Sequence, residues 1–456
     1  MELSEKLELL SYSAKYDASC ASSGSGKEGA QAYMGEAASG SSGEPSLGYR
    51  VLTGVCHSWT EDGRCVSLLK VLFSNVCIYD CAYCVNRSSS DTKRSTFKVD
   101  ELIELTTQFY RRNYIEGLFL SSGIFSDPDI VMEKLIETAK KLRCDAGFGA
   151  YIHMKIIPGT GEKMIREAGL WADRLSANIE LPTDFSLQNL APEKSGKVIL
   201  GAMKDTFELG EENSEDRRKF KMSGISAGRD AVPLFAPAGQ STQLIVGASP
   251  EDDKTIINLS GALYKKYALR RVYYSAYSPV GLPGGDGVPD KRLPEIGLWN
   301  NEVKAENFFP TLKGPAQALV LREHRLYQAD WLLRFYKFAP NEILEGEDAF
   351  LERGLDPKTA WAIRHLDFFP VEVNRASYDE LLRVPGIGAK TGRRIIETRR
   401  SRSLTFENLR RIGVVLKRAR HFITASGHYI DQPDDPGRIR RLLTDEATLQ
   451  PLLFEF

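Results

Sequence analysis

The chain has 456 residues, of which 42% are hydrophobic and 27% are charged, and its formal net charge is −1. This is the composition of an ordinary globular protein with two or three domains, and it excludes a uniformly basic protein. Any affinity for nucleic acid must therefore come from local clusters of charge. No apolar run approaches the roughly 18 residues of a membrane span, and seven cysteines are too few for a disulfide scaffold.

Residues 1–65 are predicted to form an N-terminal extension. Residues 1–10 are charged and lack the apolar core of a secretory signal, which favours a reducing, cytoplasmic location. Residues 22–46 are rich in glycine, serine and alanine without a hydrophobic period, which is typical of a flexible loop or a partly ordered lid.

From about residue 66, short apolar runs alternate with amphipathic stretches, which predicts repeated βα units and a mainly parallel sheet. Asp100 is predicted to cap the first helix, and Pro128 to open the second. Residues 182–241 are interpreted as an insertion between the fourth and fifth units. The six strands are predicted at residues 68–73, 117–120, 151–157, 174–181, 243–246 and 271–277. The predicted fold class is α/β, with a partial (β/α)6 barrel over residues 66–340.

A CxxxCxxC motif directly follows the first predicted strand, with its cysteines at Cys77, Cys81 and Cys84. Three thiolates within eight residues can converge on one soft metal centre, and they are one ligand fewer than a cubane cluster of four irons needs. The carboxyl end of a first strand is also where a βα barrel carries its chemistry. A structural zinc site and a disulfide with a spare thiol are the alternatives, but the second CxxC pair typical of structural zinc is missing downstream.

The CxxxCxxC motif resembles that of the radical S-adenosylmethionine (SAM) superfamily. The resemblance implies a [4Fe–4S] cluster on the three cysteines, SAM bound at the fourth iron, an electron donor, and reductive cleavage of SAM to a 5′-deoxyadenosyl radical. The family's common Gly-Gly-Glu-Pro after the second strand is not matched, because no acid follows Gly123. The positions that match the family's SAM site are Tyr83, Ser122, Gly123, Ser176, Asn178, Glu180 and Gly247.

Other interpretations stay open for several of these residues. The alternation of Ser176, Asn178 and Glu180 is also typical of a half-buried strand that faces solvent, and Tyr83 could simply anchor its loop. The sequence identifies no catalytic acid or base. Three further cysteines could form an auxiliary metal site or could be ordinary core residues: Cys20, Cys56 and Cys65. Three tyrosines of the sixth predicted strand could form a radical relay or could only pack in the barrel: Tyr273, Tyr274 and Tyr277.

A second domain is predicted at residues 369–430, after a linker at 341–368 and before a tail at 431–456. The sequence of residues 374–396 resembles the helix-hairpin-helix of DNA-binding proteins. A proline ends one helix, two glycines allow a tight hairpin, and the next helix begins with amides that can meet a phosphate. The predicted nucleic-acid contacts are Gly386, Gly388, Lys390, Thr391, Arg393 and Arg394. A degenerate second hairpin is predicted around Gly413.

Residues 390–420 contain eleven basic and two acidic residues, a local excess of nine positive charges that suits phosphate binding. A solvated basic face on a protein-binding hairpin domain is the alternative. The whole arrangement resembles the radical SAM proteins of DNA modification or repair, a family associated with uracil-DNA-glycosylase-like partners. That resemblance implies hydrogen abstraction from a nucleotide. The alternatives are a radical SAM enzyme that modifies tRNA and a DNA-binding protein whose metal centre is only structural.

Overall fold

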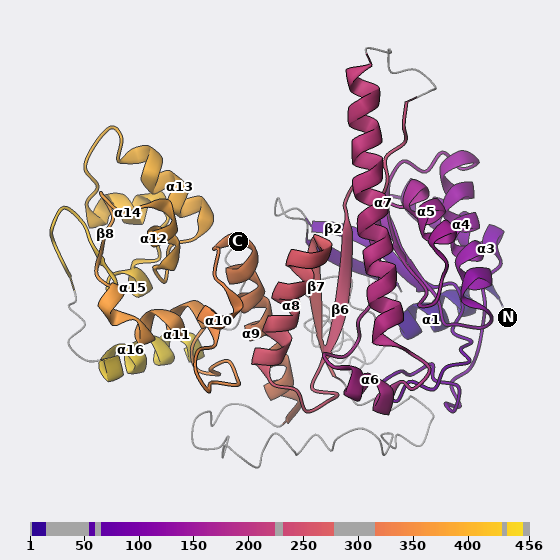
Figure 1. Cartoon of the computed structure of the whole chain (residues 1–456), viewed down its shortest axis with the longest axis horizontal. Coiled ribbons are helices and arrows are strands. Elements are labelled where there is room, and N and C mark those ends of the chain that lie inside the picture. The colour runs from indigo at the N-terminus through magenta and orange to yellow at the C-terminus, as the bar shows by residue number, and fades with distance from the viewer. Residues whose placement is uncertain are drawn as a thin grey trace, which may run out of the picture. The chain divides into compact units, whose positions relative to one another are not determined.

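The computed structural model describes residues 2–14, 54–59, 65–223, 231–277, 315–430 and 436–449 (Figure 1). Cys20 and the segment 22–46 lie outside the described residues. The chain divides into two compact units, Met1–Glu251 with Ala262–Leu298 and Asp252–Gly261 with Trp299–Phe456. Within the described part of the chain, no helix is both long and apolar enough to cross a membrane.

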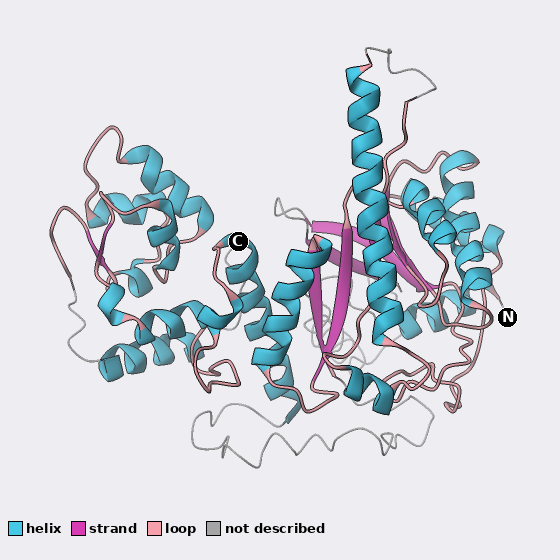
Figure 2. Cartoon of the chain, in the orientation of Figure 1, coloured by secondary structure: helices cyan, strands magenta, loops and turns pink. Residues whose placement is uncertain are grey.

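The first unit contains a curled, seven-stranded half-barrel sheet (Figure 2). The strands follow one another in chain order, and all neighbours from β2 to β7 are parallel. The edge strand β1, which the sequence did not predict, pairs with β2 in the antiparallel sense. The strands are β1 (Val55–Trp59), β2 (Cys65–Leu72), β3 (Gly117–Ser121), β4 (Tyr151–Lys155), β5 (Arg174–Ser176), β6 (Gln240–Val246) and β7 (Arg271–Ala276).

Helices follow the parallel strands, and neighbouring helices pack on one another in chain order from α3 to α4, α5 and α7. All five residues of β3 are buried, as expected of a parallel strand that is covered on both faces. This arrangement confirms the predicted partial barrel. The helices are α1 (Leu3–Ala14), α3 (Val99–Arg111), α4 (Pro128–Cys144), α5 (Glu162–Trp171), α6 (Asp184–Leu190), α7 (Gly196–Met222) and α8 (Asp253–Tyr267).

Several predicted boundaries were wrong, and two of them have a physical reason. The N-cap of α3 is Lys98, and Asp100 lies in the first turn, because Glu101 completes a capping box with the Lys98 backbone. The fourth predicted strand, β5, ends at Ser176 instead of residue 181.

The early end of β5 is caused by a side chain of the neighbouring strand β6. The Thr242 hydroxyl donates a hydrogen bond to the Ala177 carbonyl at 2.8 Å and accepts one from the Ile179 amide at 3.0 Å. A side chain thus takes the place of the backbone ladder. The chain returns to the sheet only as a single bridge between Glu180 and Leu244.

The segment 182–241, predicted as an insertion, contains the two helices that connect β5 to β6. The hydrophobic pattern of α7 covers only its first half, because no residue of this helix after Leu209 is buried. A helix that is polar on all sides leaves no period for the sequence to reveal.

The second unit is largely helical. Its hairpins are formed by α12 with α13 and by α14 with α15, and the two-residue strands β8 and β9 pair in parallel. The predicted helix-hairpin-helix is thereby confirmed. The segment predicted as a linker contains α11, most of which is buried. The elements are α9 (Pro315–Phe335), α10 (Pro340–Ile343), α11 (Pro357–Arg364), a 3-10 turn (Leu366–Phe368), β8 (Val371–Glu372), α12 (Tyr378–Arg383), α13 (Ala389–Thr398), α14 (Phe406–Ile412), α15 (Leu416–Ala419), β9 (Ile423–Thr424) and α16 (Pro436–Leu449).

Candidate cofactor site and nucleic-acid interface

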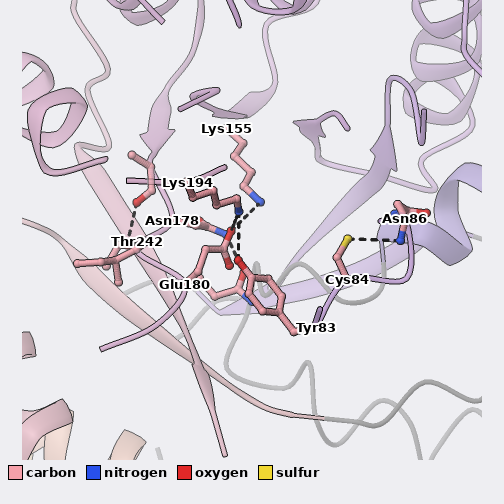
Figure 3. Close-up of polar contacts among 11 residues, drawn as sticks. Tyr83, Cys84, Asn86, Lys155, Asn178, Glu180, Lys194 and Thr242 are labelled. Atoms are coloured by element: carbon pink, nitrogen blue, oxygen red, sulfur yellow. Dashed lines mark hydrogen bonds and ion pairs between the residues drawn. The ribbon is translucent and has the colours of Figure 1, made fainter. Parts of the chain in front are cut away.

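The three motif cysteines lie in the loop between β2 and α3. Cys81 is buried, whereas Cys77 and Cys84 are half-buried. Burial raises the pKa of the Cys81 thiol, and it raises the pKa of Cys84 to about 12, although the Asn86 amide donates a hydrogen bond to the Cys84 sulfur (Figure 3). Thiols in this environment are protonated at neutral pH, so they would release protons on binding a metal.

One guanidinium holds the cysteine loop from both sides. Arg94 donates hydrogen bonds to the carbonyls of Asn75 at 2.7 Å and Asn86 at 2.8 Å, and to those of Arg87 at 2.6 Å and Ser90 at 3.0 Å. Asn75 precedes the motif, and the other three residues follow it. Because four backbone acceptors share one planar donor, Arg94 fixes where the loop leaves the sheet and where it returns.

The glycine turn after β3 lies directly against this loop. The Gly123 amide donates to the Ser74 carbonyl at 2.7 Å. A Cβ on Gly123 would lie 2.5 Å from the Val76 carbonyl oxygen, so only glycine permits this close approach. The Ser122 hydroxyl donates to the Gly123 carbonyl at 2.7 Å. The structure therefore places Ser122 and Gly123 beside the cysteine motif, and their role in binding SAM stays a prediction.

A charge network around the buried Glu180 lies at the carboxyl ends of the strands (Figure 3). The Glu180 carboxylate is 5% exposed, and the Lys194 ammonium lies 2.9 Å from its Oε1. The Lys155 ammonium is 3.9 Å from the same oxygen, and Lys194 also donates to the Tyr83 hydroxyl at 3.3 Å. The network joins the end of β4, the segment after β5, the segment before α7 and the cysteine loop.

The electrostatics of this network keep Lys194 charged. Burial alone would lower the pKa of Lys194, but Glu180 and other neighbours raise it well above its usual value. Burial raises the pKa of Tyr83 well above its usual value, so its phenol stays protonated. Sequence reasoning predicted Tyr83 and Glu180 but missed Lys155 and Lys194, since no motif contains them.

The other predicted SAM residues lie at the same edge of the sheet. Ser176 ends β5 and is buried. Asn178 is also buried and donates to the Gln243 side chain at 3.1 Å. Gly247 follows β6 with a φ of +87°. Their contacts with SAM stay predictions.

The donor set fits a cluster. Three thiols on one loop are the ligand set of a cubane with one open iron. The fit rests on the number and type of these donors, because among the described residues, the motif cysteines included, no three histidine, cysteine, aspartate or glutamate side chains converge where they could hold one metal ion. Cys56 is half-buried on β1. The auxiliary-site hypothesis stays untested, because Cys20 and the Cys65 side chain lie outside the description. Tyr273, Tyr274 and Tyr277 are buried.

In the second unit, the first hairpin is fixed by a glycine. Gly386 has a φ of +83°, and a Cβ there would lie 2.5 Å from the Val415 carbonyl oxygen. The Val415 amide donates to the Gly386 carbonyl at 3.0 Å, which ties the first hairpin to the second. Any other residue would both strain the backbone and clash.

The start of α13 presents backbone donors. Its N-cap is Gly388, and the Gly392 amide donates to the Gly388 carbonyl at 2.7 Å. The amides before Gly392 therefore lack partners within the helix, as at any helix start, and they carry the positive end of its dipole. Lys390 is exposed beside them, and Thr391 is half-buried. Such a turn can bind a phosphate.

Most of the predicted basic surface is exposed. Some of its arginines also have contacts with the backbone: Arg394 donates to the Ile412 carbonyl at 3.2 Å, and Arg399 donates to the carbonyls of Val373 and Ala376. Arg394 therefore braces the second hairpin as well as being exposed. The exposed basic residues are Lys390, Arg393, Arg394, Arg400, Arg402, Arg410, Arg411 and Lys417.

Two family models match the chain in these regions. The radical SAM superfamily matches residues 71–216, and the helix-hairpin-helix motif matches residues 368–416. The chain thus contains a radical SAM domain, which supports an enzyme of that family. Its family implies a [4Fe–4S] cluster and SAM, and its hairpin motif indicates nucleic-acid binding.

Solved structures with similarity to this chain are remote. The maturase HydG of Carboxydothermus hydrogenoformans is 14% identical with a TM-score of 0.39, over 56% of this chain and 50% of its own. The methyltransferase TsrM of Kitasatospora setae, with cobalamin and a [4Fe–4S] cluster bound, is 12% identical with a TM-score of 0.33, over 72% of this chain and 60% of its own. The chain thus spans about half the length of HydG. No curated protein sequence matches it.

Proposed function

We propose that this radical SAM enzyme acts on nucleic acid, in the modification or repair of DNA. The observation that carries the proposal is the union, in one chain, of a radical SAM domain with a helix-hairpin-helix whose surface is strongly basic. Cys77, Cys81 and Cys84 would hold the cluster. An electron donor is required as a partner, a uracil-DNA-glycosylase-like protein is a further proposed partner, and the proposed location is the cytoplasm.

The charge network around Glu180 supplies groups suited to SAM. When bound, the cluster and SAM provide one-electron cleavage of the C5′–S bond to methionine and an adenosyl radical, which takes a hydrogen atom from the substrate. Lys155 and Lys194 are proposed to bind the SAM carboxylate, because both are half-buried cations beside the buried Glu180, Lys155 at the end of β4 and Lys194 in the segment before α7. Glu180 holds both ammonium groups, and Tyr83 positions Lys194.

The hairpin supplies groups suited to the phosphate backbone. Amides near Gly388 and the exposed Lys390 are proposed to hold a phosphate, with Arg393 on the next turn of α13. Contacts of this kind position a duplex but do not read its bases. A nucleotide within a duplex would have to leave its stack before a hydrogen atom could be taken from it.

The test is mass spectrometry of the nucleosides from DNA that has been incubated with anaerobically reconstituted enzyme, SAM and reductant. We expect a nucleoside that is absent when SAM is omitted, together with 5′-deoxyadenosine. If the DNA nucleosides are unchanged and structured RNA instead stimulates SAM cleavage, the enzyme modifies RNA and the DNA assignment is wrong. Absence of any SAM cleavage by a protein with a full iron complement would leave only a structural metal centre.

A binding comparison gives a second test. Affinity for duplex DNA and for structured RNA is measured over a salt titration. Where phosphate contacts dominate, the logarithm of the binding constant falls linearly with the logarithm of the salt concentration. We expect duplex DNA to bind more tightly at each salt concentration. A preference for the RNA would contradict the DNA assignment.

A further inference from the structure

A buried lysine reaches the first hairpin from α11. Lys358 is 9% exposed, and its Nζ donates a hydrogen bond to the Ile387 carbonyl at 2.6 Å. Ile387 is the residue between the two hairpin glycines. Lys358 lies ahead of the region that matches the helix-hairpin-helix motif, residues 368–416, so the motif does not account for it.

The geometry of one peptide links this contact to the phosphate-binding turn. The Ile387 carbonyl and the Gly388 amide belong to the same peptide unit, and in a trans peptide the C=O and N–H point to opposite sides. A donor held on the carbonyl therefore fixes the direction of the Gly388 N–H on the other side. It also polarises the peptide, which makes that N–H a stronger donor.

Tyr336, the residue directly after α9, supports the same turn. The Lys358 ammonium lies 4.6 Å from the centroid of the Tyr336 ring, a cation–π distance. The Ala389 backbone hydrogen-bonds the Tyr336 hydroxyl, and a Cβ on Gly388 would lie 3.3 Å from that oxygen. Lys358 and Tyr336 thus contact the backbone of the same hairpin turn, at Ile387 and at Ala389.

We propose that Lys358 is a positioning residue of the phosphate site: its Nζ orients the Ile387–Gly388 peptide, and its positive charge strengthens the hold of the hairpin on a nucleic-acid phosphate. This inference rests on the proposed function, since it assumes that the hairpin binds nucleic acid. It adds to the proposed phosphate site a residue from outside the motif, and it predicts that the affinity for nucleic acid depends on pH.

The surroundings of Lys358 make its charge responsive near neutral pH. Burial lowers its pKa to about 7; Asp356 opposes that shift and Arg383 adds to it. Asp356 is itself held in its charged form, because Arg418 lies 3.6 Å away and Thr359 donates two hydrogen bonds. Arg325 also acts on Asp356, and Tyr336 is neutral because burial raises its pKa. The ammonium is therefore charged below about pH 7 and largely neutral above about pH 8.

The experiment measures the affinity of the full-length chain for a duplex DNA oligonucleotide from about pH 6 to about pH 8.5 at one salt concentration. We expect wild-type affinity to fall about fivefold as the pH rises, because one positive charge near the site is lost. Lys358→Met should bind the duplex about fivefold to tenfold more weakly than wild type at pH 6. Its affinity should not show the fall with rising pH that the wild type shows. Lys358→Arg, which stays charged, should bind with a flat profile.

The controls separate this role from folding and from other titrating groups. Histidines such as His421 and His428 remain in every variant, so their effect cancels in the comparison. Lys254→Met removes a lysine–carbonyl bond of the same kind, from Nζ to Gly346 at 2.5 Å, outside the hairpin, and should keep the wild-type profile. Circular dichroism and thermal unfolding establish that each variant is folded.

Each outcome decides the proposal. A Lys358→Met variant with the wild-type affinity and pH profile overturns it. If Lys358→Met does not fold, Lys358→Arg decides, because a profile that follows wild type overturns the proposal and a flat one supports it. Absence of nucleic-acid binding by the wild-type chain would instead refute the proposed function itself.

Discussion

The proposed SAM site and the proposed hairpin interface consist of different kinds of binding groups. At the proposed SAM site, the binding groups are the buried Glu180 and three half-buried side chains from separate segments, Tyr83, Lys155 and Lys194. At the hairpin, they are backbone amides of one short turn and exposed basic side chains. The first arrangement depends on crossover connections of the barrel, and the second on the local conformation of a few residues.

This difference predicts how each region responds to damage. A buried ion pair that loses one partner leaves an uncompensated charge, which is strongly destabilising. Exposed charges are screened by solvent and salt, so the loss of one has a small, nearly additive effect. Single changes should therefore be severe at the SAM site and, apart from the hairpin backbone, mild at the interface. Each should leave the activity of the other region intact.

The largest effect is expected for Cys81→Ala, which removes one of the three proposed cluster ligands. Cleavage of SAM to 5′-deoxyadenosine should fall below detection, with a matching loss of iron and sulfide, because two thiols leave the cluster open on a second side. Affinity for nucleic acid should stay within about twofold. The exposed Cys144 gives the matched control, since Cys144→Ala should retain both activities. Simultaneous loss of nucleic-acid binding in Cys81→Ala would contradict the separation of the two regions.

The next largest effect is expected for Gly386→Ala. A Cβ would meet the Val415 carbonyl at 2.5 Å, so the two hairpins must separate, and affinity for nucleic acid should fall about tenfold or more. SAM cleavage without nucleic acid should be unchanged. Gly427→Ala is the control, because Gly427 has a similar φ of +77° but nothing lies within 4 Å of its added Cβ. If both variants bind equally well, the clash at Gly386 does not govern binding.

The sequence predicted the parts that depend on local chemistry. The cysteine spacing, the hairpin glycines and the βα alternation are each contained within short stretches, and the fold confirmed the barrel and the hairpin. Lys194 could not be predicted, because its place beside Glu180 arises from the connection between β5 and α7. The end of β5 depends on Thr242, which is distant in sequence, and no strand pattern records a side chain that replaces a ladder hydrogen bond.

An intermediate effect is expected for Lys194→Met. Glu180 would lose its nearest cation and keep only Lys155 at 3.9 Å, so the affinity for SAM should fall about tenfold, measured by equilibrium dialysis or calorimetry on reconstituted enzyme. Nucleic-acid binding should not change. Lys204→Met breaks an exposed pair with Glu208 at 2.9 Å and should have no measurable effect on SAM binding. Wild-type SAM affinity in Lys194→Met would remove this lysine from the proposed carboxylate site.

The smallest effect is expected for Glu372→Gln, at the pairing of β8 with β9. Glu372 accepts hydrogen bonds from the amides of Asn374 at 3.1 Å, Ser426 at 3.1 Å and Gly427 at 3.0 Å. Burial raises its pKa, but these bonds outweigh burial and lower the pKa below its usual value. Its stabilisation is therefore present above the unfolded pKa of about 4.5 and is lost as the pH falls through the folded value.

Glu372→Gln should lower the free energy of unfolding of the hairpin domain by about 1 kcal/mol at neutral pH, and its thermal midpoint should fall less steeply than that of wild type between about pH 5 and about pH 3. The exposed Glu397, changed to glutamine, should keep the wild-type dependence. Equal acid sensitivity in the wild type and Glu372→Gln would mean that other groups set the low-pH stability. Glu372 joins β8 to the turn after β9, so its loss should loosen both hairpins and lower the affinity for nucleic acid. SAM cleavage should stay unchanged.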